Sequence, residues 1–282
     1  MFSKLLKHEW KANAGLLTIL SACALGVGLL GAGVLRAMEY VSQHMLTDQM
    51  AAIATSGLGS IMVFVVIALV AYALAVQFIN IWRFYKNKFT DEGYLTFTLP
   101  VNPHQIFLSS FLVILAWLAI SVVVLLVSGT LMLFIGLGAP PKEFWEDLLY
   151  VFQNLGEALA QIDVPGVKSF LLLTLAQVFV APVYAIVLLM TSITLGCVLA
   201  KKHKILATIG MYYVINMVVN VISSILSLVP TFLMIGEMMF GDEEYFNHLA
   251  LSMGLTLLLQ VGLCVVGYFW STYLMKHKLN LP

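Results

Sequence analysis

Few side chains of this sequence could do chemistry, and none stands in a pattern typical of catalysis. The histidines fall in expected loops or at the ends of apolar stretches, and the cysteines have the spacing of neither a metal site nor a disulfide framework, so they are interpreted as small packing residues. No H-E-x-x-H, G-x-S-x-G or G-x-x-x-x-G-K-[ST] pattern occurs. The sequence predicts no catalytic residue, no metal, no cofactor and no enzyme activity, so ATP hydrolysis would belong to another chain. The residues concerned are His8, His44, His104, His203, His248, His277, Cys23, Cys197 and Cys264.

Uncharged polar groups inside the apolar stretches form a second candidate set, namely Gln177, Asn216, Asn220 and Gln260. Asn216 and Asn220 are four residues apart and so share one face of a helix. Such groups either join helices by hydrogen bonds of about 1 kcal/mol each or line a pathway. Joining is favoured for any single residue, and both interpretations stay open. An uncharged lining would suit a large amphipathic substrate better than a small ion.

The elements that must position these groups are membrane-spanning helices. The chain of 282 residues is 61% apolar and only 10% charged, far from the roughly 25% charged residues of a soluble domain. Six stretches without Asp, Glu, Lys or Arg exceed the ~20 residues that a helix needs to cross a bilayer. They do not alternate polar and apolar residues as barrel strands would. We expect an all-α polytopic membrane protein with spans near 13–35, 58–81, 105–128, 169–200, 205–229 and 247–275.

The basic residues predict the orientation of these spans. Eleven of the 14 fall on one side of the predicted membrane, and acidic residues gather on the other, so the net charge of zero is a cancellation between the two sides. By the positive-inside rule both termini are cytoplasmic. No ionisable group is expected at depth, which disfavours a proton-coupled carrier. The eleven are Lys4, Lys7, Lys11, Arg83, Lys86, Lys88, Lys201, Lys202, Lys204, Lys276 and Lys278.

Three segments outside the spans show patterns of their own. Residues 1–12 predict an amphipathic interfacial helix, or else a basic flank that only fixes the topology. The outward segment 139–167 predicts an amphipathic helix of about 20 residues that packs on the outer surface, with sensing as the less favoured role. Pro230 predicts a break in the fifth span, with 231–240 returning as a re-entrant piece. The interfacial helix carries Phe2, Leu5, Leu6 and Trp10 on one stripe.

The cytoplasmic segment 83–104 interleaves aromatic and basic residues. Three basic residues offset by Asp91 and Glu92 make a poor nucleic-acid surface. A short helix that lies on the membrane and faces a soluble partner explains the segment, and an ordinary amphipathic loop at the headgroups explains it equally well. Gly93 can end the short helix, and Asn102-Pro103 can begin the next span with proline in its first turn.

The chain resembles the permease subunits of ABC-2 type exporters from Gram-positive bacteria. The resemblance rests on the layout of six spans with cytoplasmic termini, on the opening Leu5-Leu6-Lys7-His8-Glu9-Trp10, and above all on Asp91-Glu92-Gly93-Tyr94-Leu95-Thr96-Phe97-Thr98-Leu99-Pro100-Val101. The resemblance implies that 83–104 is a coupling segment docking on a separate ATPase, with Asp91, Glu92, Gly93, Tyr94 and Leu95 as the matching residues. It also implies an N-terminal elbow helix at 1–12, a re-entrant region after Pro230, two cassette ATPases and a second permease chain, identical or different.

Two classes of function follow. The first is the permease of a cell-membrane exporter of peptides, drugs or lipid-like molecules, powered by separate ATPases. The alternative is a non-transporting membrane sensor or assembly protein that binds a partner through its outer amphipathic helix. An intramembrane enzyme, a third class, would need a catalytic group at depth.

Overall fold

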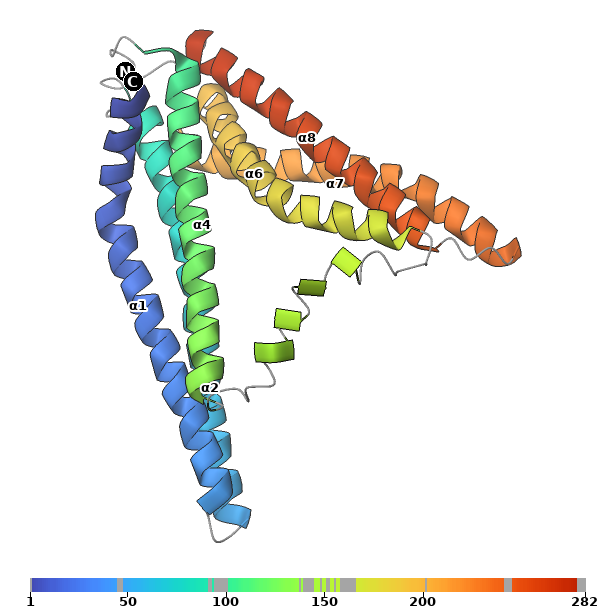
Figure 1. The fold of residues 1–282 in the computed structure, drawn as a ribbon. Helices are drawn as coiled ribbons and strands as arrows, with labels where there is room; N and C mark the ends of the chain where they lie inside the picture. Colours follow the sequence, from blue (N-terminus) through green and yellow to red (C-terminus); the bar gives the residue numbers. More distant parts are fainter. Residues whose placement is uncertain are drawn as a thin grey trace. The chain divides into compact units, whose positions relative to one another are not determined.

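Nearly all residues that the structure describes are helical, and none of them lies in a strand. This computed structural model describes residues 2–44, 48–90, 93, 101–136, 138, 145–147, 149–150, 153–154, 156–157, 166–200, 202–240 and 245–277. The long helices of Figure 1 are α1 (Phe2–His44), α2 (Asp48–Phe89), α4 (Pro103–Gly136), α6 (Val167–Leu199), α7 (Lys204–Phe240) and α8 (Tyr245–His277). All six are long and apolar enough to cross a membrane. The predicted all-α membrane fold with six spans is confirmed at this level.

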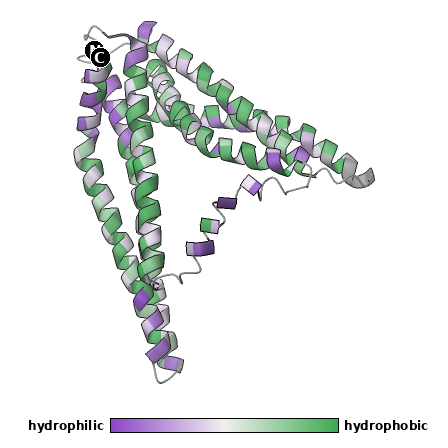
Figure 2. Ribbon diagram, in the orientation of Figure 1, coloured by the Kyte–Doolittle hydropathy of each residue, from purple (hydrophilic) through white to green (hydrophobic). Residues whose placement is uncertain are grey.

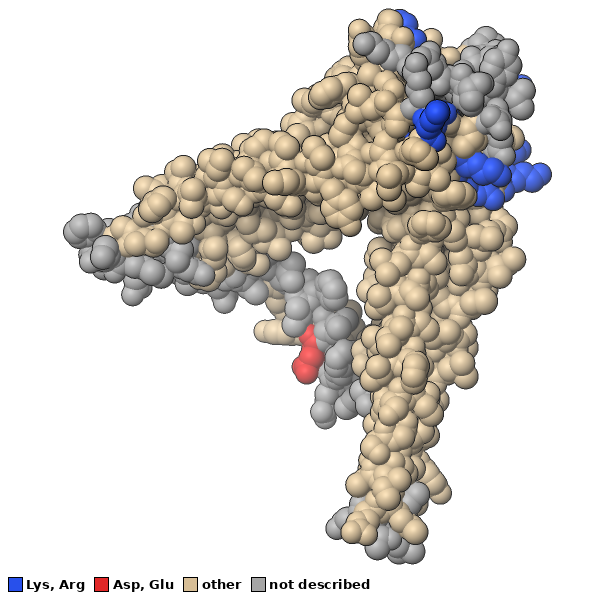
Figure 3. All heavy atoms as spheres, turned by 180° about the vertical axis from the view of Figure 1, so that it is seen from behind, with Lys and Arg blue, Asp and Glu red and all other residues tan. Residues whose placement is uncertain are grey.

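The helices are longer than a bilayer requires. α1 has 43 residues and α2 has 42, and at 1.5 Å per residue each is about 65 Å long, roughly twice the hydrocarbon thickness. In Figure 2 the bodies of the helices are largely green, and purple residues gather toward helix ends. Lys and Arg side chains likewise lie at helix ends on the face shown in Figure 3. The polar and charged residues therefore lie mainly toward the helix ends, outside the apolar parts that could cross a membrane.

The first of two compact units consists of Met1–Trp82 and Leu112–Gln153. Within it α1, α2 and α4 pack side by side around a buried apolar cluster. A Cβ built on Gly28 of α1 would lie 2.7 Å from Ser128 Cβ of α4, so the two helices approach closely where one has no side chain. Small residues at helix contacts are typical of membrane proteins. The cluster consists of Leu17, Ala24, Tyr72, Val76, Val113 and Trp117.

The second unit consists of Arg83–Phe111 and Asn154–Pro282. In it α6 packs against both α7 and α8, and α7 also contacts α8. Ser271 of α8 donates a buried hydrogen bond of 3.1 Å to the hydroxyl of Thr191 in α6. A Cβ on Gly196 of α6 would lie only 2.5 Å from Thr208 Cα of α7. Hydroxyl pairing and a glycine contact therefore hold α6 to its two neighbours.

The N-terminal residues differ from the predicted elbow helix. Residues 2–12 are the first turns of α1, which continues without interruption to His44, so these described residues do not form a helix separate from α1. No glycine or proline occurs before Gly15 to stop the helix. Of the four residues of the predicted stripe, Phe2, Leu5 and Leu6 are partly buried, whereas Trp10 is exposed, as are Lys4, Lys7 and Lys11.

The fifth long helix also differs from its prediction. α7 runs through Pro230 to Phe240, so the described residues form no re-entrant turn after the proline. Pro230 removes one backbone donor, and nearby hydroxyls can satisfy the carbonyl groups that a proline frees. Thr231 Oγ1 donates a bond of 2.7 Å to the carbonyl of Ser227, the residue after Leu226, whose carbonyl loses its helical donor at Pro230. One proline is thus accommodated inside a continuous helix.

The outer segment 139–167 is described only in fragments. Its described residues 145–147, 149–150, 153–154 and 156–157 are helical, and the other residues of the segment, apart from 166 and 167, lie outside the described residues. Trp145 stacks on Phe134 with ring centroids 5.2 Å apart. The predicted amphipathic helix over the whole segment stays a prediction.

Candidate functional site

The coupling residues implied by the family resemblance are described at one position. Gly93 is buried, and its N–H donates a 2.8 Å hydrogen bond to the carbonyl of Thr90. Asp91, Glu92, Tyr94 and Leu95 lie outside the described residues. The site is therefore built from the base of the coupling segment, residues 83–90, where α2 ends.

Aromatic side chains connect the end of α2 to two other helices of the second unit. Phe84 meets Phe89 edge to face at 5.7 Å and Phe107 of α4 at 6.5 Å. Phe107 in turn meets Tyr268 of α8 edge to face at 5.4 Å. Such pairs contribute about 0.5–1.5 kcal/mol each beyond the area they bury. We call Phe89, Phe84, Phe107 and Tyr268 the aromatic chain.

A cation ties the same segment to α7. Lys204, the first residue of α7, donates a hydrogen bond of 3.2 Å from Nζ to the backbone carbonyl of Phe89. Phe89 is 2% exposed, so this carbonyl belongs to a buried residue. His104 Nδ1 and the hydroxyl of Tyr268 are hydrogen-bonded at 3.1 Å and join the start of α4 to α8. The end of α2 is thereby attached to α4, α7 and α8.

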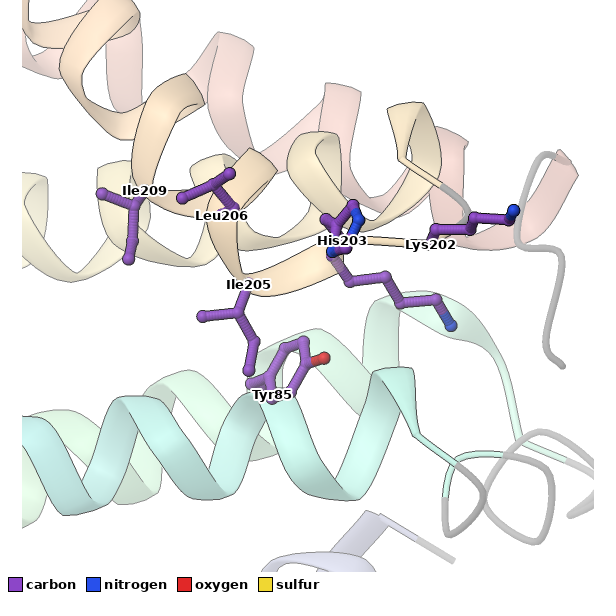
Figure 4. A pocket seen from close by; sticks show the side chains of 7 residues that line it. Tyr85, Lys202, His203, Ile205, Leu206 and Ile209 are labelled. Atoms are coloured by element: carbon purple, nitrogen blue, oxygen red, sulfur yellow. The ribbon is translucent and has the colours of Figure 1, made fainter.

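A pocket of about 440 Å³ opens beside this attachment. Tyr85 and Ile205 point toward one another from α2 and α7 (Figure 4). Lys202 and His203 lie at one end of the pocket, whereas Leu206 and Ile209 lie farther along α7 (Figure 4). The pocket therefore has a basic end and an apolar end. Its lining residues are Tyr85, Lys202, His203, Lys204, Ile205, Leu206 and Ile209.

The four polar residues predicted as joining or pathway-lining groups separate into two sets. Gln177 of α6 donates a 2.9 Å hydrogen bond from Nε2 to Gln260 Oε1 of α8, and both side chains are partly buried. Asn216 donates to the carbonyl of Tyr212 in its own helix at 2.9 Å. Asn220 is exposed. The two glutamines therefore join α6 to α8, whereas the hydrogen bond of Asn216 stays within α7 and Asn220 of the same helix is exposed.

The first unit contains a buried polar cluster in which Asn80, a polar residue of the second predicted span, has a partner that the sequence did not predict. Asn13 of α1 donates to Asn80 of α2 at 3.4 Å, and the two residues are 4% and 1% exposed. Asn13 Oδ1, Asn80 Nδ2 and Trp117 Nε1 are buried without a hydrogen-bond partner among the described residues. Glu9, one turn before Asn13, is 8% exposed. The spacing of Glu9, Asn13 and Leu17 by four residues was a signal that one inward face carries both polar and apolar groups.

The elbow residues pack on the first unit. Trp10 stacks on Trp117 of α4 with centroids 5.1 Å apart, and Leu6 packs against the buried cluster of that unit. An interfacial helix would instead turn this face to the lipid headgroups. Leu6 and Trp10 of the predicted stripe thus contact other helices of the first unit, and Trp10 remains 39% exposed.

Among the described residues no group of three His, Cys, Asp or Glu side chains could hold a metal ion. Cys23, Cys197 and Cys264 all lie in described helices and are free thiols. Comparisons with family models, curated proteins and solved structures found no match. What the protein does must therefore be argued from its own residues.

Proposed function

We propose that this chain is the membrane-spanning permease subunit of an ATP-binding-cassette exporter in the cell membrane. The end that carries Lys202, Lys204 and Lys276 would face the cytoplasm, with both termini on that side. Two separate ATPase subunits would dock on residues 83–104, and a second permease chain would complete the pathway. The cargo would be a peptide, a drug or a lipid-like molecule, and this chain itself would hydrolyse no ATP.

The observation that carries the proposal is the attachment of residues 83–90. A coupling element must be accessible from outside the membrane and rigidly connected to the spans that move. The end of α2 contacts α4 through Phe84 and α7 through Lys204, and Phe107 of α4 in turn contacts Tyr268 of α8. An ATPase that binds this segment differently in its two nucleotide states would shift the packing of these helices.

The exposed face of α7 supports a second permease chain. Between Lys204 and Leu233 of α7, Val219 and Pro230 are the only described residues that are buried. Asn220, near the middle of this helix, is exposed, and an amide that faces hydrocarbon without a partner costs about 1–3 kcal/mol or more. Tyr213, Ser224 and Thr231 are also exposed and share its side of the helix. This face would line the pathway that two permease chains enclose.

Reconstitution with a cassette ATPase that copurifies with this chain tests the proposal. We expect no ATP hydrolysis by the purified chain alone, and transport in vesicles only when the ATPase is present. Lys204→Met, which removes the bond to the Phe89 carbonyl, should lower substrate-stimulated ATPase activity severalfold, because one attachment of the coupling segment is lost. Glu92→Ala combined with Tyr94→Ala should lower it further.

Lys276→Met is the matched control, since Lys276 is an exposed lysine at the end of α8. It should leave the stimulation unchanged. Intact coupling in both Lys204→Met and Glu92→Ala/Tyr94→Ala would contradict the coupling role. A chain that captures no ATPase and moves no substrate would instead favour the sensor or assembly protein.

A further inference from the structure

The pocket beside Lys204 lies where the chain changes from polar to apolar. Lys202 and His203 precede α7, which begins at Lys204, and the apolar stretch of the predicted span begins at Ile205. Leu206 and Ile209 follow on the first turns of the span and are 72% and 49% exposed. In a membrane the pocket would therefore have its basic end at the headgroups and its apolar end among the acyl chains.

The charge of the lining fits an anion. Lys202 and His203 are exposed, Lys204 is partly buried, and none of the seven lining residues is acidic. Lys204 uses one of the three donors of its ammonium group on Phe89, so donors remain for another group. The basic end also lies at the start of a helix, where negative charge is stabilised further. The lining offers positive charge without a carboxylate of its own to neutralise it.

The apolar end distinguishes between ligands of the same charge. Ile205, Leu206 and Ile209 bring three branched aliphatic side chains to the pocket. A free phosphate has nothing to place against them, and a water-soluble protein cannot reach side chains that lie below the headgroups. A molecule with a phosphate and hydrocarbon chains matches both ends, and basic pockets between membrane helices are a known arrangement for acidic lipid headgroups.

We propose that this pocket binds one anionic phospholipid, with its phosphate at Lys202, His203 and Lys204 and an acyl chain along Leu206 and Ile209. The volume of about 440 Å³ is in the range of small-molecule sites and holds the headgroup, while the chains lie along the exposed side of α7. The inference needs only that the six helices lie in a membrane. It does not depend on the proposed exporter function.

The test uses the purified full-length chain without any ATPase, in nanodiscs of phosphatidylglycerol mixed with phosphatidylcholine. Native mass spectrometry after detergent exchange measures which lipid stays bound. We expect one phosphatidylglycerol to be retained in preference to phosphatidylcholine. Lys202→Gln combined with His203→Gln should reduce this retention at least about fivefold, the effect of one lysine near an anionic lipid.

The chain offers a closely matched control in Lys276 and His277, a second Lys-His pair, which ends α8 and lies outside the pocket. Lys276→Gln combined with His277→Gln makes the same change in charge and should leave the retention unchanged. An equal loss in both double variants would show a general surface attraction and overturn the proposal.

Two further arms distinguish the sources of the phosphate. Leu206→Ser combined with Ile209→Ser should lower lipid retention, whereas inorganic phosphate at millimolar concentration should not displace the lipid. If free phosphate displaces the lipid and the Leu206→Ser/Ile209→Ser variant retains it as well as the unmodified protein does, the pocket binds a soluble anion instead. If a variant does not fold, a photoreactive phosphatidylglycerol added to the unmodified protein should crosslink within residues 202–209, and crosslinking elsewhere alone would also overturn the proposal.

Discussion

In each unit a hydrogen bond between two side-chain amides joins two helices, but the pair in the first unit is buried and the pair in the second unit is only partly buried. In the first unit Asn13 and Asn80 are 4% and 1% exposed and meet at 3.4 Å. In the second unit Gln177 and Gln260 meet at 2.9 Å and are only partly buried. The deeper pair has the longer hydrogen bond and leaves one atom of each amide without a described partner.

This difference separates a structural role from a functional one. A third of the most apolar window of α4 is buried, whereas Val219 and Pro230 are the only buried residues among those described between Lys204 and Leu233 of α7. The amides of Asn13 and Asn80 are enclosed by the helices of the first unit and can act only on packing. The amides of Gln177 and Gln260 in the second unit are only partly buried, so a substrate or another chain can contact them.

The largest effect is expected at the contact of α6 with α7. Gly196→Ala would place Cβ 2.5 Å from Thr208 Cα, and because the obstacle is backbone the helices must separate. We expect a loss of about 1–3 kcal/mol in the free energy of unfolding. Trp270 is the one tryptophan of the second unit, and Trp10, Trp82, Trp117 and Trp145 belong to the first. The fluorescence of Trp270, obtained by subtracting the signal of a Trp270→Phe variant, therefore reports the unfolding of the second unit.

Gly210→Ala in α7 is the control, because nothing lies within 4 Å of a Cβ at that position. It should be neutral or stabilise the helix by up to about 1 kcal/mol. Equal destabilisation by both substitutions, or a loss reported mainly by the four other tryptophans, would contradict the separate packing of the second unit.

The positions of the spans could be predicted from the sequence, but their partners could not. Long charge-free runs predict helices, because a chain in lipid must form its backbone hydrogen bonds within the helix itself. The start of α4 at Pro103 also agrees with the prediction from that proline. The pairing of Asn13 with Asn80 joins residues 67 apart, and this requires knowing which faces of α1 and α2 meet. The continuity of α1 could not be predicted, because a basic amphipathic start has the same pattern as an interfacial helix. The two are distinguished only by the packing of Leu6 against the buried cluster of the first unit.

The buried asparagine pair should show strong coupling. Asn13→Leu alone leaves the Asn80 amide buried without its partner, at an expected cost of about 1–2 kcal/mol, and Asn80→Leu should act alike. The double variant removes both amides and should cost no more than either single one. A double-mutant cycle of unfolding free energies in detergent measures the coupling. Additive losses would mean that the two amides act independently and that packing alone explains their burial.

The glutamine pair should respond differently. Gln177→Leu and Gln260→Leu should change the free energy of unfolding by less than about 1 kcal/mol, because each amide is partly exposed. Under the proposed export function, either substitution should lower transport severalfold in the reconstituted complex. Ser252→Ala, a substitution on α8 two turns from Gln260, serves as a control. A stability loss as large as that of the asparagine pair, with transport unchanged, would remove the contrast between the two units.

The smallest expected effect concerns the hydroxyl at the end of the aromatic chain. Tyr268→Phe removes the hydrogen bond to His104 but keeps the ring that meets Phe107 at 5.4 Å. The loss should be about 0.5–1 kcal/mol, because the ring contact rather than the hydroxyl carries most of the attachment. Tyr273→Phe is the control, since Tyr273 is 56% exposed on the same helix and should change nothing measurable. A loss above about 2 kcal/mol in Tyr268→Phe, read from Trp270 fluorescence, would mean that the hydroxyl and not the aromatic chain fixes α4 to α8.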